Sequence, residues 1–283
     1  NQAALERQLQ QFFNHLTGVE QRREMRAPFP AVLIAFVMNE LHLSGLTRLA
    51  LIGSKLPVRL CDEDVINLVE CLIAANIQLE ELHLLHHNIT DSGLEEICRL
   101  LDKGLFSNSQ HQGLSILDLT GNEISGDCIE NTLLVSKYDC PLVTLNVSSN
   151  PITSQGHLML AYMCRMNTRL RRLIINSCAF DLGGLNTLLS ALANNQTLET
   201  LSLDRPLLPN VKEGGVIEHF SKILPTNRSL AHLSLKNHTL YDHHATLLAD
   251  ALFRNDRMIS LNLESNRIGK LILTVVIIFL FMI

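Results

Sequence analysis

The residues best suited to metal chemistry are histidines that gather at two places in the chain. His238, His243 and His244 form one group, and a second pair occupies positions 86–87. A zinc site needs three or four ligands that converge on one point, together with partners that orient them. Both groups instead fall where a strand should end and a helix begin, and polar residues are common in such turns. The sequence therefore predicts turn residues, with a metal site as the less favoured alternative.

Seven cysteines offer the other reactive side chains. Their number is odd and no C-x-x-C pair occurs, which argues against a disulfide framework and against a zinc knuckle. A cysteine nucleophile needs a nearby general base, whereas Cys164 and Cys178 fall at positions of a repeating pattern that predict burial. Free buried thiols are typical of a reducing compartment, so we expect an intracellular protein, cytoplasmic or nuclear.

Nucleotide-binding signatures are missing from the sequence, in both the G-x-x-x-x-G-K-[ST] and the G-x-G-x-x-G form. The pair Gly214 and Gly215 lacks the remaining residues of either motif. Five N-x-S/T sequons occur, but those at Asn195 and Asn227 fall in the turn before a strand, where we expect a structural role and no glycan. The chain is predicted to be no enzyme and to have no catalytic residue, cofactor or metal.

A repeat that runs through most of the chain positions these residues. The pattern L-x-x-L-x-L-x-x-N-x-I begins at Leu114 and Leu142 and, as MISLNLESNRI, at Met258. Looser copies bring the array to about eight units, and most successive starts differ by 28 residues. A unit of this size is typical of a leucine-rich repeat solenoid, in which each unit buries its apolar face against its neighbours. We predict an α/β horseshoe with parallel strands on the concave face and helices on the convex face.

Each unit is expected to alternate inward and outward side chains along its strand and then to turn at a buried asparagine. In the unit that begins at Leu114, Leu117 and Leu119 point inward while Asp118 points outward. A buried Asn amide can bond the backbone of adjacent coils and so build a ladder, and Asn stands at three of the eight ladder positions. The column reads Ser54, His87, Asn122, Asn150, Cys178, Pro206, His238 and Asn266.

The repeats divide the chain into three parts. Residues 1–45 do not repeat, and we interpret them as a helical N-terminal cap, with a dimerising or partner-binding helix as the alternative. Residues 46–269 form the array. Residues 270–283 are an apolar tail, shorter than the roughly 20 residues that span a bilayer. We interpret the tail as a truncated or alternatively encoded end; a membrane anchor or a segment folded onto the last coil are the alternatives. The apolar stripe of the cap is formed by Leu5, Leu9, Phe12, Phe13 and Leu16.

From Leu46 to Ile268 the sequence resembles the ribonuclease-inhibitor-like class of leucine-rich repeat proteins, whose signature is a 28-residue unit with a full helix. The degenerate unit LSLDRPLL, with Pro206 in the ladder and four extra residues after it, resembles one subgroup of that class. This resemblance implies a non-enzymatic interaction protein with loose links to nuclear or nucleolar settings. Ran-type GTPase-activating proteins share the repeat class, so regulation of a small GTPase is the first alternative function. A membrane-tethered adaptor is the second.

A partner protein of unknown identity is expected to bind the outward strand positions, because solenoids commonly use their concave surface for recognition. An ordinary solvated strand face is the alternative. The insertions at residues 106–113 and 209–215 are further candidates, since loops on a rigid scaffold often carry recognition. The predicted partner-binding residues are Glu81, His83, Asp118, Asn146, Arg172, Asp204, Arg205, His232, Lys236, Asn262 and Glu264.

Other classes of partner are not expected. The formal net charge is −5 and no long basic run stands out, so the sequence does not predict nucleic-acid binding. Membrane contact is not expected unless the apolar tail inserts.

Overall fold

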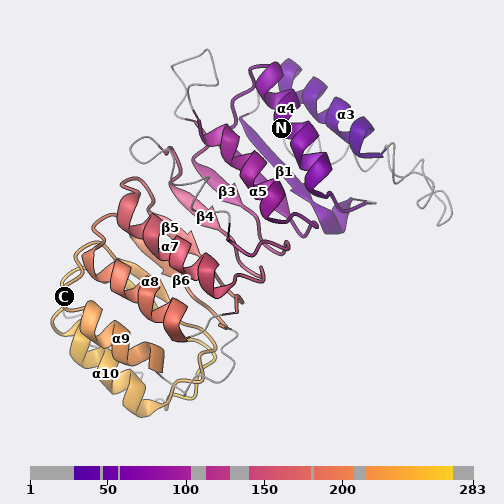
Figure 1. The fold of residues 1–283 in the computed structure, drawn as a ribbon. Helices are drawn as coiled ribbons and strands as arrows, with labels where there is room; N and C mark the ends of the chain where they lie inside the picture. The colour runs from indigo at the N-terminus through magenta and orange to yellow at the C-terminus, as the bar shows by residue number, and fades with distance from the viewer. Residues whose placement is uncertain are drawn as a thin grey trace. The chain divides into compact units, whose positions relative to one another are not determined.

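The computed structural model describes residues 29–44, 47–56, 58–102, 113–127, 140–179, 182–206 and 215–269. The predicted N-terminal stripe, the apolar tail and nearly all of the two insertions lie outside these ranges. The chain forms two compact units, Asn1–Glu123 and Ile124–Ile283, each with its own strands and helices (Figure 1).

The first unit is a parallel sheet with helices on one face (Figure 1). Leu49, Leu82 and Leu117 lie side by side in the register, so equivalent residues of successive repeats pair without offset. All three leucines are fully buried, because they point from the sheet toward the helices. Its elements are α3 (Phe29–Ser44), β1 (Arg48–Ile52), the 3-10 turn Gly53–Lys55, α4 (Asp62–Ala74), β2 (Glu81–Leu85), α5 (Asp91–Cys98), the 3-10 turn Arg99–Leu101 and β3 (Ile116–Asp118).

The described residues of the second unit repeat the plan with five parallel strands, β4 to β8. Leu145, Leu173, Leu201 and Leu233 stand in one register row and are buried between sheet and helices. Both units have the α/β architecture predicted for leucine-rich repeats. The elements are β4 (Thr144–Asn146), α7 (Ser154–Met166), β5 (Arg172–Ile174), α8 (Leu182–Asn194), β6 (Thr200–Ser202), α9 (Gly215–Ile223), β7 (His232–Ser234), α10 (Asp242–Leu252) and β8 (Ser260–Asn262).

The predicted asparagine ladder holds consecutive coils together. Asn122 donates from Nδ2 to the carbonyl oxygens of Leu84 at 2.8 Å and Leu119 at 2.9 Å. Its Oδ1 accepts the backbone N–H of Ile89 at 3.3 Å. The amide thereby satisfies three backbone groups that the turn removes from water, which would otherwise cost about 1–3 kcal/mol each.

Two histidines make equivalent bonds at other ladder positions. The Nδ1 atom of His87 accepts the backbone N–H of Leu60 at 3.1 Å, and Nε2 lies 3.2 Å from the carbonyl oxygen of Leu51. Since Nδ1 accepts, the ring proton belongs on Nε2. His238 bonds the carbonyl oxygen of Leu203 through Nε2 in the same way. These imidazoles therefore replace Asn as structural groups.

Asn150 and Asn266 bond neighbouring backbone groups as Asn122 does, whereas the ladder positions that carry neither Asn nor His are weaker. Cys178 reaches the carbonyl oxygen of Val147 through its sulfur at 3.4 Å. Pro206 has no side-chain donor, as predicted from its type. Ser54 is exposed, so the expectation that it belongs to the buried column is wrong; the buried residue at this turn is Gly53.

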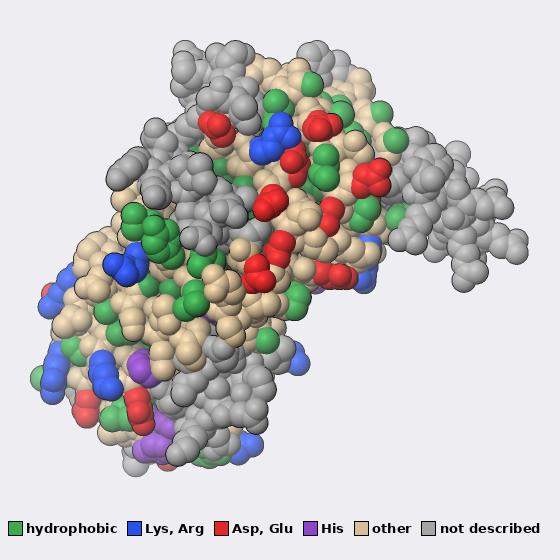
Figure 2. Space-filling model, viewed as in Figure 1, with side chains coloured by type: hydrophobic (Ala, Val, Ile, Leu, Met, Phe, Trp, Pro, Cys, Tyr) green, Lys and Arg blue, Asp and Glu red, His purple; other side chains and the backbone are tan. Residues whose placement is uncertain are grey.

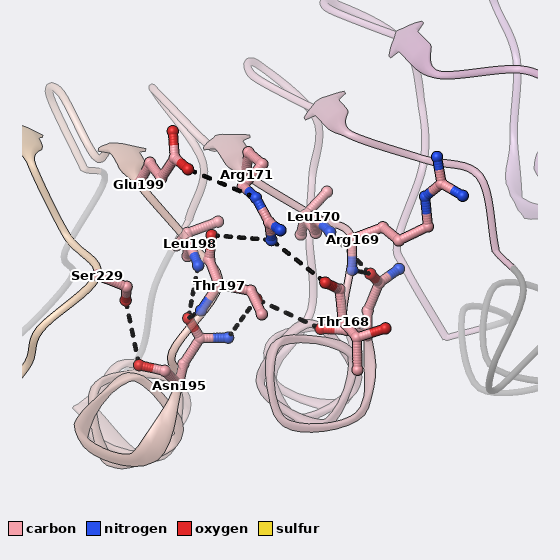
Figure 3. A network of polar contacts seen from close by, with 10 residues as sticks. Thr168, Arg169, Leu170, Arg171, Asn195, Thr197, Leu198, Glu199 and Ser229 are labelled. Atoms are coloured by element: carbon pink, nitrogen blue, oxygen red, sulfur yellow. Dashed lines mark hydrogen bonds and ion pairs between the residues drawn. The ribbon is translucent and has the colours of Figure 1, made fainter. Parts of the chain in front are cut away.

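A second column of buried asparagines closes the helices of the second unit. Asn195 accepts the backbone N–H of Thr197 at 3.0 Å and of Leu198 at 2.7 Å through Oδ1 (Figure 3). Its Nδ2 donates to the carbonyl oxygen of Cys164. Asn227 is 1% exposed and makes the same contacts one repeat later. Both sequon asparagines thus hold the turn before a strand, in the structural role predicted for them.

Within the described residues, no helix combines the length and the apolar character needed to cross a membrane.

Candidate protein-binding surface

The predicted partner-binding residues lie on the side of each sheet that faces away from the helices, which we call the strand face. It consists of the outward side chains of the strands and of the turn that follows each strand. Along β4, Leu145 is fully buried, while Thr144 and Asn146 on either side of it are partly exposed. The strand face is described separately for each unit.

In the first unit, four ionisable side chains form one network across β1, β2 and β3. Arg48 Nε lies 3.0 Å from Glu81 Oε2, and His83 Nε2 lies 3.3 Å from the same carboxylate oxygen. His83 Nδ1 is 3.9 Å from Asp118 Oδ2 on the neighbouring strand. The register explains this arrangement, because Glu81 pairs with Arg48, and His83 with Asp118.

The network shifts the pKa values of His83 and Asp118. The hydrogen bond to Asp118 raises the pKa of His83, while partial burial acts in the opposite direction. Burial favours the neutral form of Asp118, but hydrogen bonds from His83 and from Thr120 outweigh it and lower the pKa of Asp118. The pair therefore favours an imidazolium next to a carboxylate on the strand face.

In the second unit, polar side chains follow each strand and bond the next coil; we call them the outer column. Ser148 Oγ accepts the backbone N–H of Asn176 at 3.0 Å. Asn176 Oδ1 accepts the N–H of Asp204 at 2.7 Å, and Asp204 Oδ1 accepts that of Lys236 at 2.9 Å. Asp204 also accepts the hydroxyl of Ser234 at 2.6 Å. These side chains join the coils at the surface, as the ladder does inside.

Several predicted binding residues are therefore engaged in structure. The Asp204 carboxylate holds the next coil, and Lys236 forms an ion pair with Glu264. Asn146 and Asn262 accept backbone N–H groups of their own turns, at 3.1 Å each. A substitution at any of these positions would change folding as well as recognition.

Three other predicted residues are exposed and make no hydrogen bond or ion pair through their side chains with another described residue. They are Arg172, Arg205 and His232. Arg172 and His232 both stand at the first strand position, with Thr200 between them in the register. Arg205 has φ of 48°, in the left-handed region that side-chain-bearing residues rarely occupy. Arg205 is thus exposed at a left-handed turn that follows β6.

Sequence reasoning missed the outer column, although the signal was present. A polar residue recurs directly after the last inward leucine or its equivalent, as Ser148, Asn176, Asp204, Lys236 and Glu264. The pattern indicates exposed positions, but not that a side chain bonds the coil that follows it.

The cysteines and histidines that could have carried chemistry are buried or take part in structural hydrogen bonds. Burial raises the pKa of the Cys164 thiol to about 12 and that of Cys178 to about 11, so both thiols stay protonated. His244 accepts the backbone N–H of Tyr241 at 3.0 Å and helps to cap α10. Among the described residues, no three His, Cys, Asp or Glu side chains are grouped as metal ligands would be.

No family model matches the chain. Its sequence is similar to NACHT, LRR and PYD domains-containing protein 5 of Bos taurus, with 24% identity over 255 residues, 80% of this chain and 22% of that protein. The human protein 14 of the same series is 28% identical over 236 residues, 83% of this chain and 20% of that protein. The human protein 3 is 24% identical over 213 residues, 65% of this chain and 20% of that protein. The chain spans about a fifth of the length of these relatives, and it is leucine-rich-repeat-like.

Two solved structures resemble the fold only loosely. Leiomodin-1 Actin-Binding Site 2 covers 54% of this chain and 85% of its own, with 18% identity and a TM-score of 0.46. The TLR13–ssRNA13 complex covers 68% of this chain and 33% of its own, with 15% identity and a TM-score of 0.30. Scores this low carry no further information about the chain.

Proposed function

We propose that this chain is a non-enzymatic scaffold that binds a partner protein on its strand face. The observation that carries the proposal is the exposure of Arg172, Arg205 and His232 beside side chains that are held by the outer column. Two of the three, Arg172 and Arg205, are cations whose side chains bond no other described residue, so they can meet carboxylates with little reorganisation. The partner surface is therefore one that presents Asp or Glu side chains.

The side chain that Arg205 places at its turn supports this choice. Other repeats place Gly121, Ser149, Ser177 or Asn237 at the same left-handed turn position. Glycine and asparagine adopt this conformation with little strain, whereas a long side chain costs more. Arg205 thus presents a long cationic side chain at a turn position that the other repeats, His86 excepted, fill with a short residue.

The setting that we propose is intracellular, cytoplasmic or nuclear. Two observations support it: the cysteines among the described residues are not joined in disulfide bonds, and Asn195 and Asn227 are buried rather than available for glycans. The segment around LSLDRPLL also resembles leucine-rich repeat-containing protein thirty-four, a resemblance that favours a nuclear or nucleolar interaction protein.

The test compares two double variants that change charge equally. Arg172→Glu with Arg205→Glu reverses the exposed cations of the strand face. Arg165→Glu with Arg254→Glu reverses exposed arginines of the same unit at the ends of α7 and α10. Partners are collected by proximity labelling in cells, and the dissociation constant of each variant is then measured with the purified partner. We expect the strand-face pair to weaken binding about tenfold to a hundredfold, since each reversed contact costs about 1 kcal/mol or more.

Two results would contradict the proposal. A partner that is lost with the Arg165 and Arg254 pair but kept with the strand-face pair would move binding away from the strand face. Acceleration of GTP hydrolysis by a bound GTPase, at catalytic amounts of this chain, would show that it is more than a scaffold.

A further inference from the structure

A groove of about 1010 Å³ lies between α3 and α4 in the first unit. One wall consists of Ala31, Ile34, Ala35 and Met38, which share one face of α3. These residues belong to the first turns of α3, close to where the helix begins at Phe29. The groove therefore opens near the point at which the preceding chain enters the unit.

The opposite wall is a stripe along α4. Asn67, Cys71 and Ala74 of α4 line the groove, together with Ala75 directly after the helix, and Ala31 and Ala35 line it from α3. The alanines leave room for another element to approach both backbones closely. Cys71 is only partly buried, so its thiol reports on whether the groove is filled.

The composition of α3 indicates that the groove needs an apolar occupant. Leu33 and Val37 are 2% and 1% exposed, which accounts for one side of the helix. Ala31 and Ala35 remain exposed on another side, although the helix sequence FPAVLIAFVMNELHLS is apolar nearly all round. A helix that is apolar on every side is normally covered on every side.

The surroundings of the groove also call for positive charge. Glu63 and Asp64 belong to its lining, with Arg59 as the basic residue among them. Helix α4 carries four acidic residues and α5 three, and neither contains Lys or Arg; Arg99, directly after α5, pairs with one of them, Glu96. Figure 2 shows the acidic side chains gathered over the part of the helix layer where α4 and α5 lie. An apolar element flanked by cations would satisfy both requirements.

The chain itself contains such an element directly before α3. Leu5, Leu9, Phe12, Phe13 and Leu16 predict one apolar helical face. Arg22, Arg23 and Arg26 follow it and outnumber Glu20 and Glu24 in the same run, which leaves a net charge of +1 (3 − 2). We propose that the groove is the docking site of residues 4–26 of this same chain, with the apolar stripe against the groove and the arginines toward the acidic helix layer.

Length and connection favour this occupant over a separate molecule. A helix of 13 residues is about 20 Å long, which matches the 13 residues of α4. Residues 17–28 can extend to about 40 Å, more than the roughly 24 Å of α3, so the segment can fold back along the groove. A short tether also gives an effective concentration in the millimolar range, well above that of a second molecule in dilute solution.

The test reads the reactivity of Cys71 in the full-length chain. Alkylation by a small maleimide is followed over time, and mass spectrometry of peptides gives the rate for each cysteine separately. Leu9→Glu with Phe12→Glu places charge on the predicted stripe. Gln11→Glu with Asn14→Glu places the same charge on the opposite side of the same predicted helix and serves as the control.

We expect Cys71 to react at least about tenfold faster in the stripe variant than in the parent chain, since an undocked segment no longer protects the groove. The control variant should react like the parent, and protection should not depend on protein concentration. The buried thiols of Cys98, Cys164 and Cys178 should stay unreactive in all samples, which shows that the fold is intact.

Other results overturn the proposal. Equal Cys71 rates in the parent and the stripe variant would mean that the segment does not fill the groove. Protection that grows with protein concentration would identify a second copy as the occupant. Reversal of Arg22, Arg23 and Arg26 to Glu should also speed Cys71 labelling; an unchanged rate would remove the charged half of the proposal.

Discussion

His87 shows how one side chain can replace another without changing its structural role. Its imidazole accepts the N–H of Leu60 and contacts the carbonyl of Leu51, as the amide of Asn122 does for Ile89 and Leu84. The two groups differ in that only the imidazole can be protonated. Burial lowers the pKa of His87 to about 4, because a charged ring there would lose its hydration.

This difference predicts an acid-sensitive contribution to stability. Between pH 6.5 and pH 4 the unfolded chain binds a proton at His87 that the folded chain does not, so stability is lost as pH falls through this window. His87→Asn keeps both ladder bonds and removes the titration. From pH 6.5 to pH 5 the parent should lose about 2 kcal/mol more unfolding free energy than the variant. Urea titrations at the two pH values measure this.

The neighbouring substitution His86→Asn is the control for that experiment. His86 is exposed at a left-handed turn position, φ 59°, which Asn tolerates. The unfolding free energy of the His86→Asn variant should change between the two pH values as much as that of the parent. If His87→Asn also lost stability as the parent does, the ladder histidine would not be the source of acid sensitivity.

Residue types were sufficient to locate the ladder but not to assign its bonds. The sequence pattern placed His87 and Cys178 in the column, and both are there. It could not indicate that Asp204 bonds Lys236, because that contact joins residues 32 positions apart through a register known only from the folded chain. Among the predicted binding residues, sequence therefore could not separate the anchored Asp204 from the exposed Arg205.

At the scale of elements, glycines allow consecutive coils to approach each other at the starts of helices. A Cβ at Gly93 would lie 2.5 Å from Asp62 Oδ1 and 2.6 Å from Ile89 Cγ2. Asp62 needs this proximity, since the same oxygen accepts the N–H of Gly93 at 3.1 Å and of Thr90 at 2.8 Å. The start of α4 thus caps the start of α5. The repeat predicted the positions of strands and helices. It could not predict the close approach of Gly93 to Asp62, since that contact depends on packing between coils.

Gly93→Ala should therefore destabilise the chain, although alanine is the better helix former. The clash with Asp62 and Ile89 costs about 1–3 kcal/mol, against about 1 kcal/mol gained in helix propensity. Gly183→Ala, at an exposed position in α8, is the matched control and should be neutral or stabilising. Urea midpoints for the two variants give the comparison. A gain in stability for Gly93→Ala would show that α5 can move away from α4 at little cost.

At the scale of the whole molecule, the repeat predicted the architecture but not its division into two compact units. The 28-residue period depends on the spacing of inward leucines, and the period continues through both units. The packing of particular side chains decides at which point along the chain the contacts between residues become fewer. The period contains no information about that, because a repeat array specifies neighbours rather than boundaries.

The two units should lose structure in separate steps, since each has its own buried core. The chain has no Trp, and its tyrosines at positions 138, 162 and 241 all belong to the second unit, so tyrosine fluorescence reports that unit alone. Far-ultraviolet circular dichroism reports both. In a urea titration, Gly93→Ala should lower the midpoint of one dichroism phase and leave the tyrosine midpoint unchanged. Equal shifts in both signals would show that the chain unfolds as one cooperative array, and the stabilising effect of every contact in the first unit would then extend to the strand face of the second.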